Sequence, residues 1–169
     1  MKAKIIVGLA AAVLASVTIA AIAAVASFTL TRPAPEVQFT GLSGERFTTS
    51  DLRGKVVLVN FWATWCPDCI KEMPKLVETH RKFAPRGYET VSVVVRQDTA
   101  ENVVRFNAKH ALPFRIALDS SGEVAREFGR VRLTPTTFVI DKKGKILQRY
   151  VGEPNWTELH QLVERELRS

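Results

Sequence analysis

Cysteine is scarce in this sequence, and its scarcity limits the roles that the two present can have. Only Cys66 and Cys69 occur among the 169 residues, and two residues separate them. A disulfide between them closes too short a loop to restrict the unfolded chain much, and no further pair is available as a structural crosslink. The pair is therefore expected to serve chemistry rather than stability.

Histidine is scarce as well, which limits metal binding. Tetrahedral zinc needs about four ligands, and His80, His110 and His160 lie far apart in the sequence, on different expected helices. We expect no metal and no cofactor, so that a Cys66–Cys69 disulfide is the redox group. A module that binds copper or zinc without catalysis is the non-enzymatic alternative.

Aromatic residues are not interleaved with the basic ones, and this argues against a nucleic-acid partner. Lys and Arg number 24 against 17 Asp and Glu, which gives a net charge of +7. The basic residues are scattered and lack neighbouring aromatic side chains on which bases would stack. We expect a solvated basic surface and no nucleic acid.

Charge is absent from one long segment, Ile5–Leu30, which contains 26 residues. About 20 apolar residues span a bilayer, and Lys2 and Lys4 before the segment are expected to stay inside. Residues 1–30 are thus predicted to form a membrane anchor or a signal segment. An Ala-x-Ala site at residues 24–26 would allow cleavage, whereas the segment exceeds the roughly 7–15 residues of a signal core and favours an uncleaved anchor.

Both interpretations place the rest of the chain outside the cytoplasmic membrane. The expected location is a single pass through that membrane, with the catalytic domain on the periplasmic or extracytoplasmic side. Residues 31–35 contain two prolines and form a short, stiff linker. Residues 36–169 have the length of one domain.

Strand and helix patterns alternate through this domain. Residues 56–62 form an apolar run typical of a strand covered on both faces, and residues 36–49 are expected to form a hairpin. The fold class is therefore α/β, a central mixed sheet with helices on both faces, preceded by this hairpin and the membrane helix. Further strands are expected over 90–95, 114–118, 136–140 and 146–151. Helices are expected from Cys66 or Pro67, from Asp98 to about His110, over 123–128, and from Asn155, with Asp98 and Asn155 as the caps of their helices.

The two cysteines are expected in the first turn of a helix, where residues three apart share a face and can form a disulfide. The unpaired N–H groups and positive end of the helix favour an anion, which lowers the pKa of the Cys66 thiol. Cys66 is expected to be exposed and to attack a substrate disulfide. Cys69, one turn deeper, is expected to resolve the mixed disulfide.

Two segments resemble the membrane-anchored thioredoxin-like proteins of the TlpA/ResA type. The first, residues 59–74, contains Trp65-Cys66-Pro67-Asp68-Cys69, and the second, residues 134–144, begins with Thr134-Pro135. The resemblance covers about residue 36 to the C terminus. It implies a thioredoxin-like fold and thiol–disulfide oxidoreductase activity.

The resemblance also implies roles for single residues. Thr134-Pro135 matches the family's cis-proline, which faces the dithiol and is expected, with Trp65 and Pro67, to contact the substrate. Glu72 matches the family's acidic residue beside the resolving cysteine. A glutamate buried there would have a raised pKa and would accept the Cys69 proton, whereas an exposed helix glutamate is the alternative.

Three departures from related patterns bear on activity. Asn60 stands where ordinary thioredoxins have a buried Asp. Because Asn cannot act as a base, this role is expected to fall to Glu72. Asp68 places a negative charge beside the thiols, opposes thiolate formation and predicts a more reducing couple. Residues 129–133 are one residue longer than the usual approach to the cis-proline, which would alter substrate contacts.

We therefore expect a disulfide reductase that a transmembrane thiol-electron donor recharges. The resemblance suggests apocytochrome c cysteines or copper-site assembly proteins as substrates. A thiol oxidant or isomerase is the enzymatic alternative. Peroxidase activity is not expected, because Ala63 stands where peroxiredoxins have Thr or Ser.

Overall fold

The computed structural model describes residues 32–169, and the predicted membrane segment, residues 1–30, lies outside them. Within the described part, no helix has the length and apolar character needed to cross a bilayer.

A six-stranded sheet forms the centre of the domain, in the order β1-β8-β7-β4-β5-β6. Strand β4 pairs in parallel with β5 and antiparallel with β7, so the sheet is mixed, as predicted. All seven residues of β4 are buried, which explains its continuous apolar sequence. The strands are β1 (Arg32–Pro33), β4 (Val56–Trp62), β5 (Tyr88–Val94), β6 (Arg115–Leu118), β7 (Thr136–Ile140) and β8 (Lys145–Val151).

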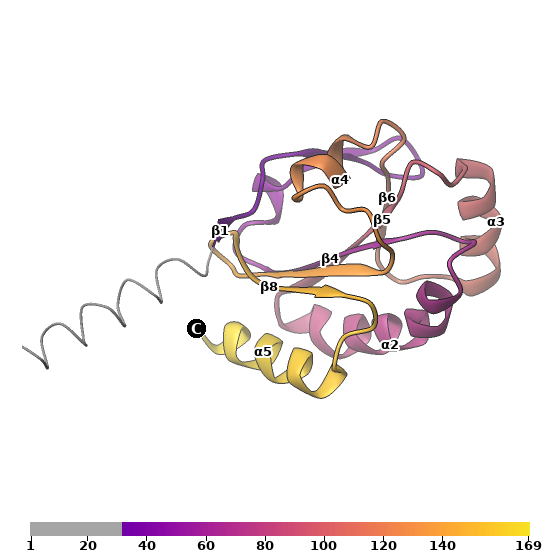
Figure 1. The fold of residues 1–169 in the computed structure, drawn as a ribbon. Coiled ribbons are helices and arrows are strands. Elements are labelled where there is room, and N and C mark those ends of the chain that lie inside the picture. Colours follow the sequence, from indigo (N-terminus) through magenta and orange to yellow (C-terminus); the bar gives the residue numbers. More distant parts are fainter. Residues whose placement is uncertain (1–31) are drawn as a thin grey trace, which may run out of the picture. The chain divides into compact units, whose positions relative to one another are not determined.

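Helices cover both faces of this sheet. Figure 1 shows α2 and α5 on one side of the sheet and α4 on the other. The fold is thus thioredoxin-like, with the α/β class confirmed. The helices are α2 (Pro67–Phe83), α3 (Ala100–His110), α4 (Glu123–Glu127) and α5 (Trp156–Arg168), and two short 3-10 turns are η1 (Ser50–Leu52) and η2 (Ala84–Arg86).

A small antiparallel pair, β2 (Gln38–Thr40) and β3 (Arg46–Thr48), lies between β1 and β4 in the chain and forms a second sheet. Its two phenylalanines, Phe39 and Phe47, stack with ring centroids 5.0 Å apart. An isolated antiparallel bridge between Gly41 and Ala117 joins this pair to β6, the last strand of the sheet.

The predicted cap of α5 is confirmed, and the predicted cap of α3 is wrong. Asn155 caps α5 as predicted, since its side chain accepts hydrogen bonds from the backbone N–H groups of residues 157 and 158. The expected cap of α3 is wrong. Thr99 takes that position and accepts from the Asn102 N–H, because the Asp98 carboxylate is occupied by a residue from another part of the chain, as described below.

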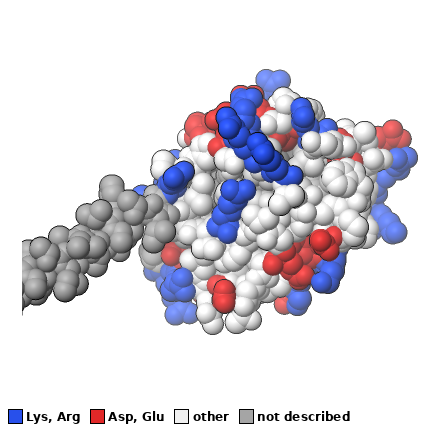
Figure 2. Space-filling model, viewed as in Figure 1, with Lys and Arg blue, Asp and Glu red and all other residues white. Residues whose placement is uncertain are grey.

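Charge is distributed unevenly over the surface. In Figure 2 much of the visible face is uncharged, with acidic and basic side chains scattered over it, while basic side chains gather around the position of α4 in Figure 1.

Candidate active site

The two cysteines form a disulfide at the start of α2. Their sulfur atoms are 2.10 Å apart and their Cα atoms 5.3 Å apart. Cys66 is the N-cap in an extended conformation, Pro67 follows in the first turn, and the Cys69 N–H donates to Cys66 Sγ over 3.2 Å. The predicted helix start is confirmed. The same N–H would stabilise a Cys66 thiolate once the bond is reduced.

The exposure of Cys66 differs from the prediction. Cys66 is only 4% exposed and Cys69 is fully buried, while the neighbouring Trp65 is 56% exposed. The reason is that, in the disulfide form, the Cys66 sulfur is bonded to Cys69 and held over the first turn of α2 by the Cys69 N–H. Trp65 and Pro67 are the exposed residues that flank the reactive sulfur.

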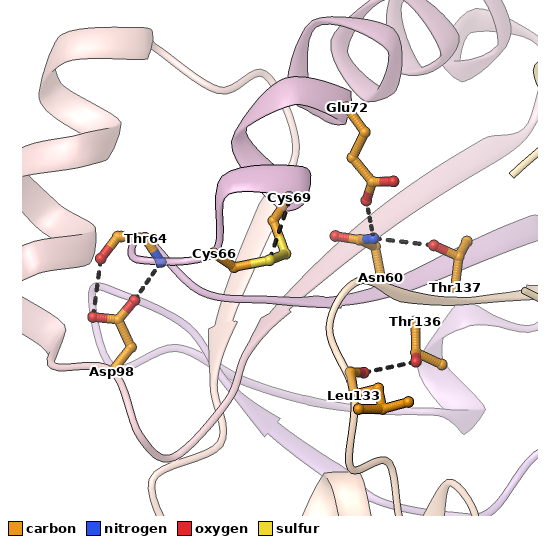
Figure 3. The surroundings of a disulfide bond; sticks show 9 residues. All are labelled: Asn60, Thr64, Cys66, Cys69, Glu72, Asp98, Leu133, Thr136 and Thr137. Atoms are coloured by element: carbon orange, nitrogen blue, oxygen red, sulfur yellow. Dashed lines mark hydrogen bonds between the residues drawn. A yellow bond between two sulfur atoms is a disulfide. The ribbon is translucent and has the colours of Figure 1, made fainter. Parts of the chain in front are cut away.

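Asp98 anchors the loop before the disulfide, a role that its sequence pattern, which predicts only a helix cap, does not indicate. Its carboxylate accepts the Thr64 N–H at 2.5 Å and the Thr64 hydroxyl at 3.1 Å (Figure 3). Burial would raise the pKa of Asp98, but the hydrogen bonds from Thr64, Thr99 and Asn102 outweigh burial and hold that pKa below its usual value. Thr64 lies two residues before Cys66, so this contact fixes the approach of the chain to the dithiol.

Asp98→Ala is expected to lower the free energy of unfolding by about 2 kcal/mol, because hydrogen bonds to a charged group are lost. Attack of the reduced protein on a small disulfide should slow by about tenfold, since the Cys66 position is less well fixed. Asp51→Ala is a matched control. Asp51 also accepts the N–H and hydroxyl of a threonine, Thr48, but at an exposed site. Urea denaturation and stopped-flow kinetics measure both effects, and equal losses in the two variants would contradict the positioning role.

A buried polar group lies beneath the disulfide, and Glu72 is its centre. Glu72 is fully buried on α2, one helical turn after Cys69. Asn60 from β4 donates its amide to Glu72 Oε1 at 2.9 Å and to the Thr137 hydroxyl at 3.0 Å (Figure 3). Among residues 32–169, Glu72 Oε2 has no hydrogen-bond partner. The prediction of a buried rather than an exposed glutamate is confirmed.

Burial raises the pKa of Glu72 from 4.5 to about 7. The hydrogen bond from Asn60 acts in the opposite direction, while the charges of Glu153 and Asp68 add to the increase. A carboxyl group with a pKa near neutrality can both accept and return a proton at physiological pH.

The second predicted segment also lies in the surroundings of the disulfide. The Thr134–Pro135 bond is cis, as predicted. Pro135 is buried and its carbonyl accepts the Gly152 N–H at 2.9 Å, while the Thr136 hydroxyl donates to the Leu133 carbonyl at 2.8 Å. Figure 3 shows Leu133 and Thr136 near the cysteines, so the segment that carries the cis bond borders the site.

The described residues contain no group of three or more His, Cys, Asp or Glu side chains placed to hold a metal ion. Two of the histidines contact threonine hydroxyls within the domain. His160 contacts the Thr79 hydroxyl at 2.8 Å, and His80 contacts the Thr90 hydroxyl at 3.2 Å.

A cysteine pair spaced by two residues, formed as a disulfide at a helix start on this fold, places the chain in the class of thioredoxin-like dithiol proteins. Comparison with known proteins identifies its relatives within that class. The Redoxin family model matches residues 30–165. The thiol-disulfide oxidoreductase ResA of Bacillus thuringiensis subsp. konkukian is 35% identical over 134 residues, which are 79% of this chain and 76% of that protein.

Two further similarities agree. The thioredoxin-like protein YneN of Bacillus subtilis is 33% identical over 132 residues, covering 78% of this chain and 76% of that protein. The crystal structure of a thiol:disulfide interchange protein of the thioredoxin family from Chlorobium tepidum superimposes with a TM-score of 0.72 at 30% identity, over 80% of this chain and 95% of that one. The chain belongs to the Redoxin family, and its activity class is that of a thiol–disulfide oxidoreductase of the ResA type.

Proposed function

We propose that this domain is a disulfide reductase that acts outside the cytoplasmic membrane. The observation that carries the proposal is the buried Glu72 carboxyl one turn beyond Cys69, at the foot of a disulfide that starts a helix. A buried ionisable group beside a purely structural disulfide would not be expected, because burying a carboxylate costs stability. A disulfide that opens and closes needs a group that takes and returns a proton.

The reaction follows from the roles of the three side chains. In the reduced protein, the Cys66 thiolate attacks a substrate disulfide, forms a mixed disulfide and releases one substrate thiolate. Glu72 accepts the proton of the Cys69 thiol, and the resulting thiolate attacks the Cys66 sulfur. The second substrate sulfur leaves as a thiolate, which is protonated by Glu72 or by water. The substrate gains two electrons, and the Cys66–Cys69 pair loses two and closes.

Asp68 supports the reductive direction. It is exposed in the first turn of α2, between the two cysteines. A negative charge there opposes a thiolate at Cys66, and a reduced form that is less stabilised makes a stronger reductant. We propose protein disulfides as substrates, those of apocytochrome c or of copper-site assembly proteins among them, and a transmembrane thiol-electron donor that restores the dithiol.

The potential of the Cys66–Cys69 couple tests the direction. After equilibration in dithiothreitol or glutathione buffers, alkylation and mass measurement give the reduced fraction. We expect a value near that of thioredoxin, roughly −270 mV. A value near roughly −120 mV would make the protein an oxidant, and the absence of a reversible titration would favour a metal-binding module.

The location is proposed from the sequence pattern before the domain. The charge-free run of residues 5–30 follows two lysines, and positive residues stay on the cytoplasmic side. We therefore expect protease added to intact spheroplasts to digest residues 36–169 while a cytoplasmic marker survives. Digestion only after lysis would contradict this location.

A further inference from the structure

A groove adjoins the dithiol on the side of α4. It has a volume of about 510 Å³, and its lining includes Trp65, which precedes Cys66, and Thr134, which precedes the cis-proline. A substrate segment next to the disulfide under attack would therefore lie in or beside this groove. Disulfide exchange involves only the sulfur atoms of the substrate, so the lining of the groove decides which neighbouring residues of a substrate are favoured.

Four arginines surround this groove, and all are exposed. Arg96 follows β5, Arg126 is on α4, and Arg130 and Arg132 lie on the segment that leads to the cis-proline. We call these residues, with Trp65 and Thr134, the arginine groove. Basic side chains gather in this region of the surface in Figure 2.

Most of this positive charge lacks an internal partner. Arg126 pairs with Glu123 at 3.4 Å and with Glu127 at 3.1 Å. Among residues 32–169, no carboxylate lies within ion-pair distance of Arg96, Arg130 or Arg132. Their guanidinium groups are therefore available to a ligand.

The acidic residue in the lining does not cancel this charge at the surface. Asp119 is only 2% exposed, and its carboxylate oxygens accept the Val124 N–H at 3.0 Å and the Ala125 N–H at 2.8 Å. Asp119 thus holds the first turn of α4 in place, and its oxygens are engaged by the backbone rather than by the arginines of the groove.

Backbone hydrogen bonds fix the main-chain positions of Arg126 and Arg130. Arg130 has a φ of 56°, a left-handed conformation that residues other than glycine rarely adopt. Its N–H donates to the Arg126 carbonyl at 2.9 Å, and the Val131 N–H donates to the Ala125 carbonyl at 2.8 Å. The segment is tied to α4 before any ligand binds, and such preorganisation lowers the entropic cost of binding.

We propose that the arginine groove binds an acidic polypeptide segment next to the substrate disulfide, and so selects substrates by charge. This inference rests on the proposed reductase function for its biological meaning. A polypeptide is favoured over a lipid headgroup or a free anion because the groove is continuous with Trp65 and Thr134 at the dithiol, whose reaction partner is a protein disulfide. Guanidinium groups pair with carboxylates through two parallel hydrogen bonds, which suits Asp and Glu side chains.

The test uses the oxidised full-length chain in non-ionic detergent and short, fluorescently labelled peptides without cysteine. One peptide carries Asp and Glu, and a second has Asn and Gln at the same positions. Fluorescence anisotropy at low salt is expected to show about tenfold tighter binding of the acidic peptide, and the preference should shrink near 0.15 M salt. Equal binding of the two peptides would overturn the proposal, as would displacement of the acidic peptide by glycerol phosphate, a headgroup probe, at equal or lower concentration.

Paired variants locate the binding site. In Arg130→Gln/Arg132→Gln the preference for the acidic peptide should fall to within about twofold. The control, Arg165→Gln/Arg168→Gln, removes two arginines that line a separate groove on α5, on the other side of the sheet from α4 (Figure 1). The control should keep the wild-type preference. An equal loss in both variants would assign the preference to net charge and overturn the proposal.

A kinetic measurement separates this inference from the function on which it rests. The reduced wild-type chain is mixed with two peptides that share one disulfide and differ in flanking acidic or amide residues. Reduction of both peptides at the same rate would leave the reductase function intact and overturn charge selection. Selective binding without reduction of either peptide would contradict the reductase function, while the arginine groove would stand as a peptide site.

Discussion

The Cys69→Ser variant is expected to accumulate as a covalent adduct with its substrate, while turnover falls by about a thousandfold or more. Cys66 is the N-cap of α2 and its sulfur accepts the Cys69 N–H, so this sulfur is the one stabilised as a thiolate. Cys69 is fully buried and meets a substrate only after Cys66 has done so. Without the second thiol, the mixed disulfide has no internal nucleophile to resolve it.

Non-reducing electrophoresis and intact mass measure the adduct, and a coupled assay measures turnover. Cys66→Ser is the matched control, because it removes the same number of sulfur atoms but leaves the buried one. That variant should form no adduct and show no turnover. Adduct formation through Cys69 in the Cys66→Ser protein would reverse the two roles.

Glu72→Gln is expected to slow resolution of the mixed disulfide by about a hundredfold at pH 8, because the base that receives the Cys69 proton is lost. In the wild type, burial brings the pKa of Glu72 to about 7, so the resolving rate should rise with pH up to that value and level off above it. The variant should lose this step in its pH profile. Glu78→Gln is a suitable control, since Glu78 lies on the same helix but is exposed and paired with Lys75.

Glu72→Gln should lower activity but raise stability. The pKa of Glu72 is raised from 4.5 to about 7 on folding, so the folded protein binds a proton more tightly than the unfolded chain in that interval. The contribution of Glu72 to the free energy of unfolding therefore falls as pH rises from 4.5 to 7 and is lowest above 7. At pH 8 Glu72→Gln should be more stable by roughly 3 kcal/mol. Urea denaturation of the disulfide form at pH 5 and pH 8 measures this, and a variant less stable at pH 8 would show that Glu72 is retained for structure.

Local patterns were enough to predict the core of the domain and the reactive pair. The apolar run of β4 and the proline after Cys66 each determine structure within a few residues, and both matched. Sequence alone could not assign Asp98. Asp98 and Thr99 are both good helix caps, and the choice between them depends on Thr64, which is 34 residues away.

The arginine groove could be predicted only in part. The sequence shows that its segment 129–133 is one residue longer than usual, yet Arg96 and Arg126 join it from other elements of the fold. Their arrangement depends on how the loop after β5 packs beside α4, which no spacing in the sequence specifies. Burial of Cys66 was missed for a related reason, because exposure depends on the oxidation state of the pair as well as on position in the helix.

The bridge between Gly41 and Ala117 has a consequence for a protein that handles other polypeptides. Strand β6 ends the sheet, and an open edge strand offers unpaired N–H and C=O groups to any extended chain. The β2–β3 pair attaches at this edge, and the Arg115 guanidinium lies over the Phe47 ring, 4.6 Å from its centroid. The edge is thus shielded against strand addition. An unfolded substrate would therefore bind at the dithiol and would not pair with β6 and aggregate.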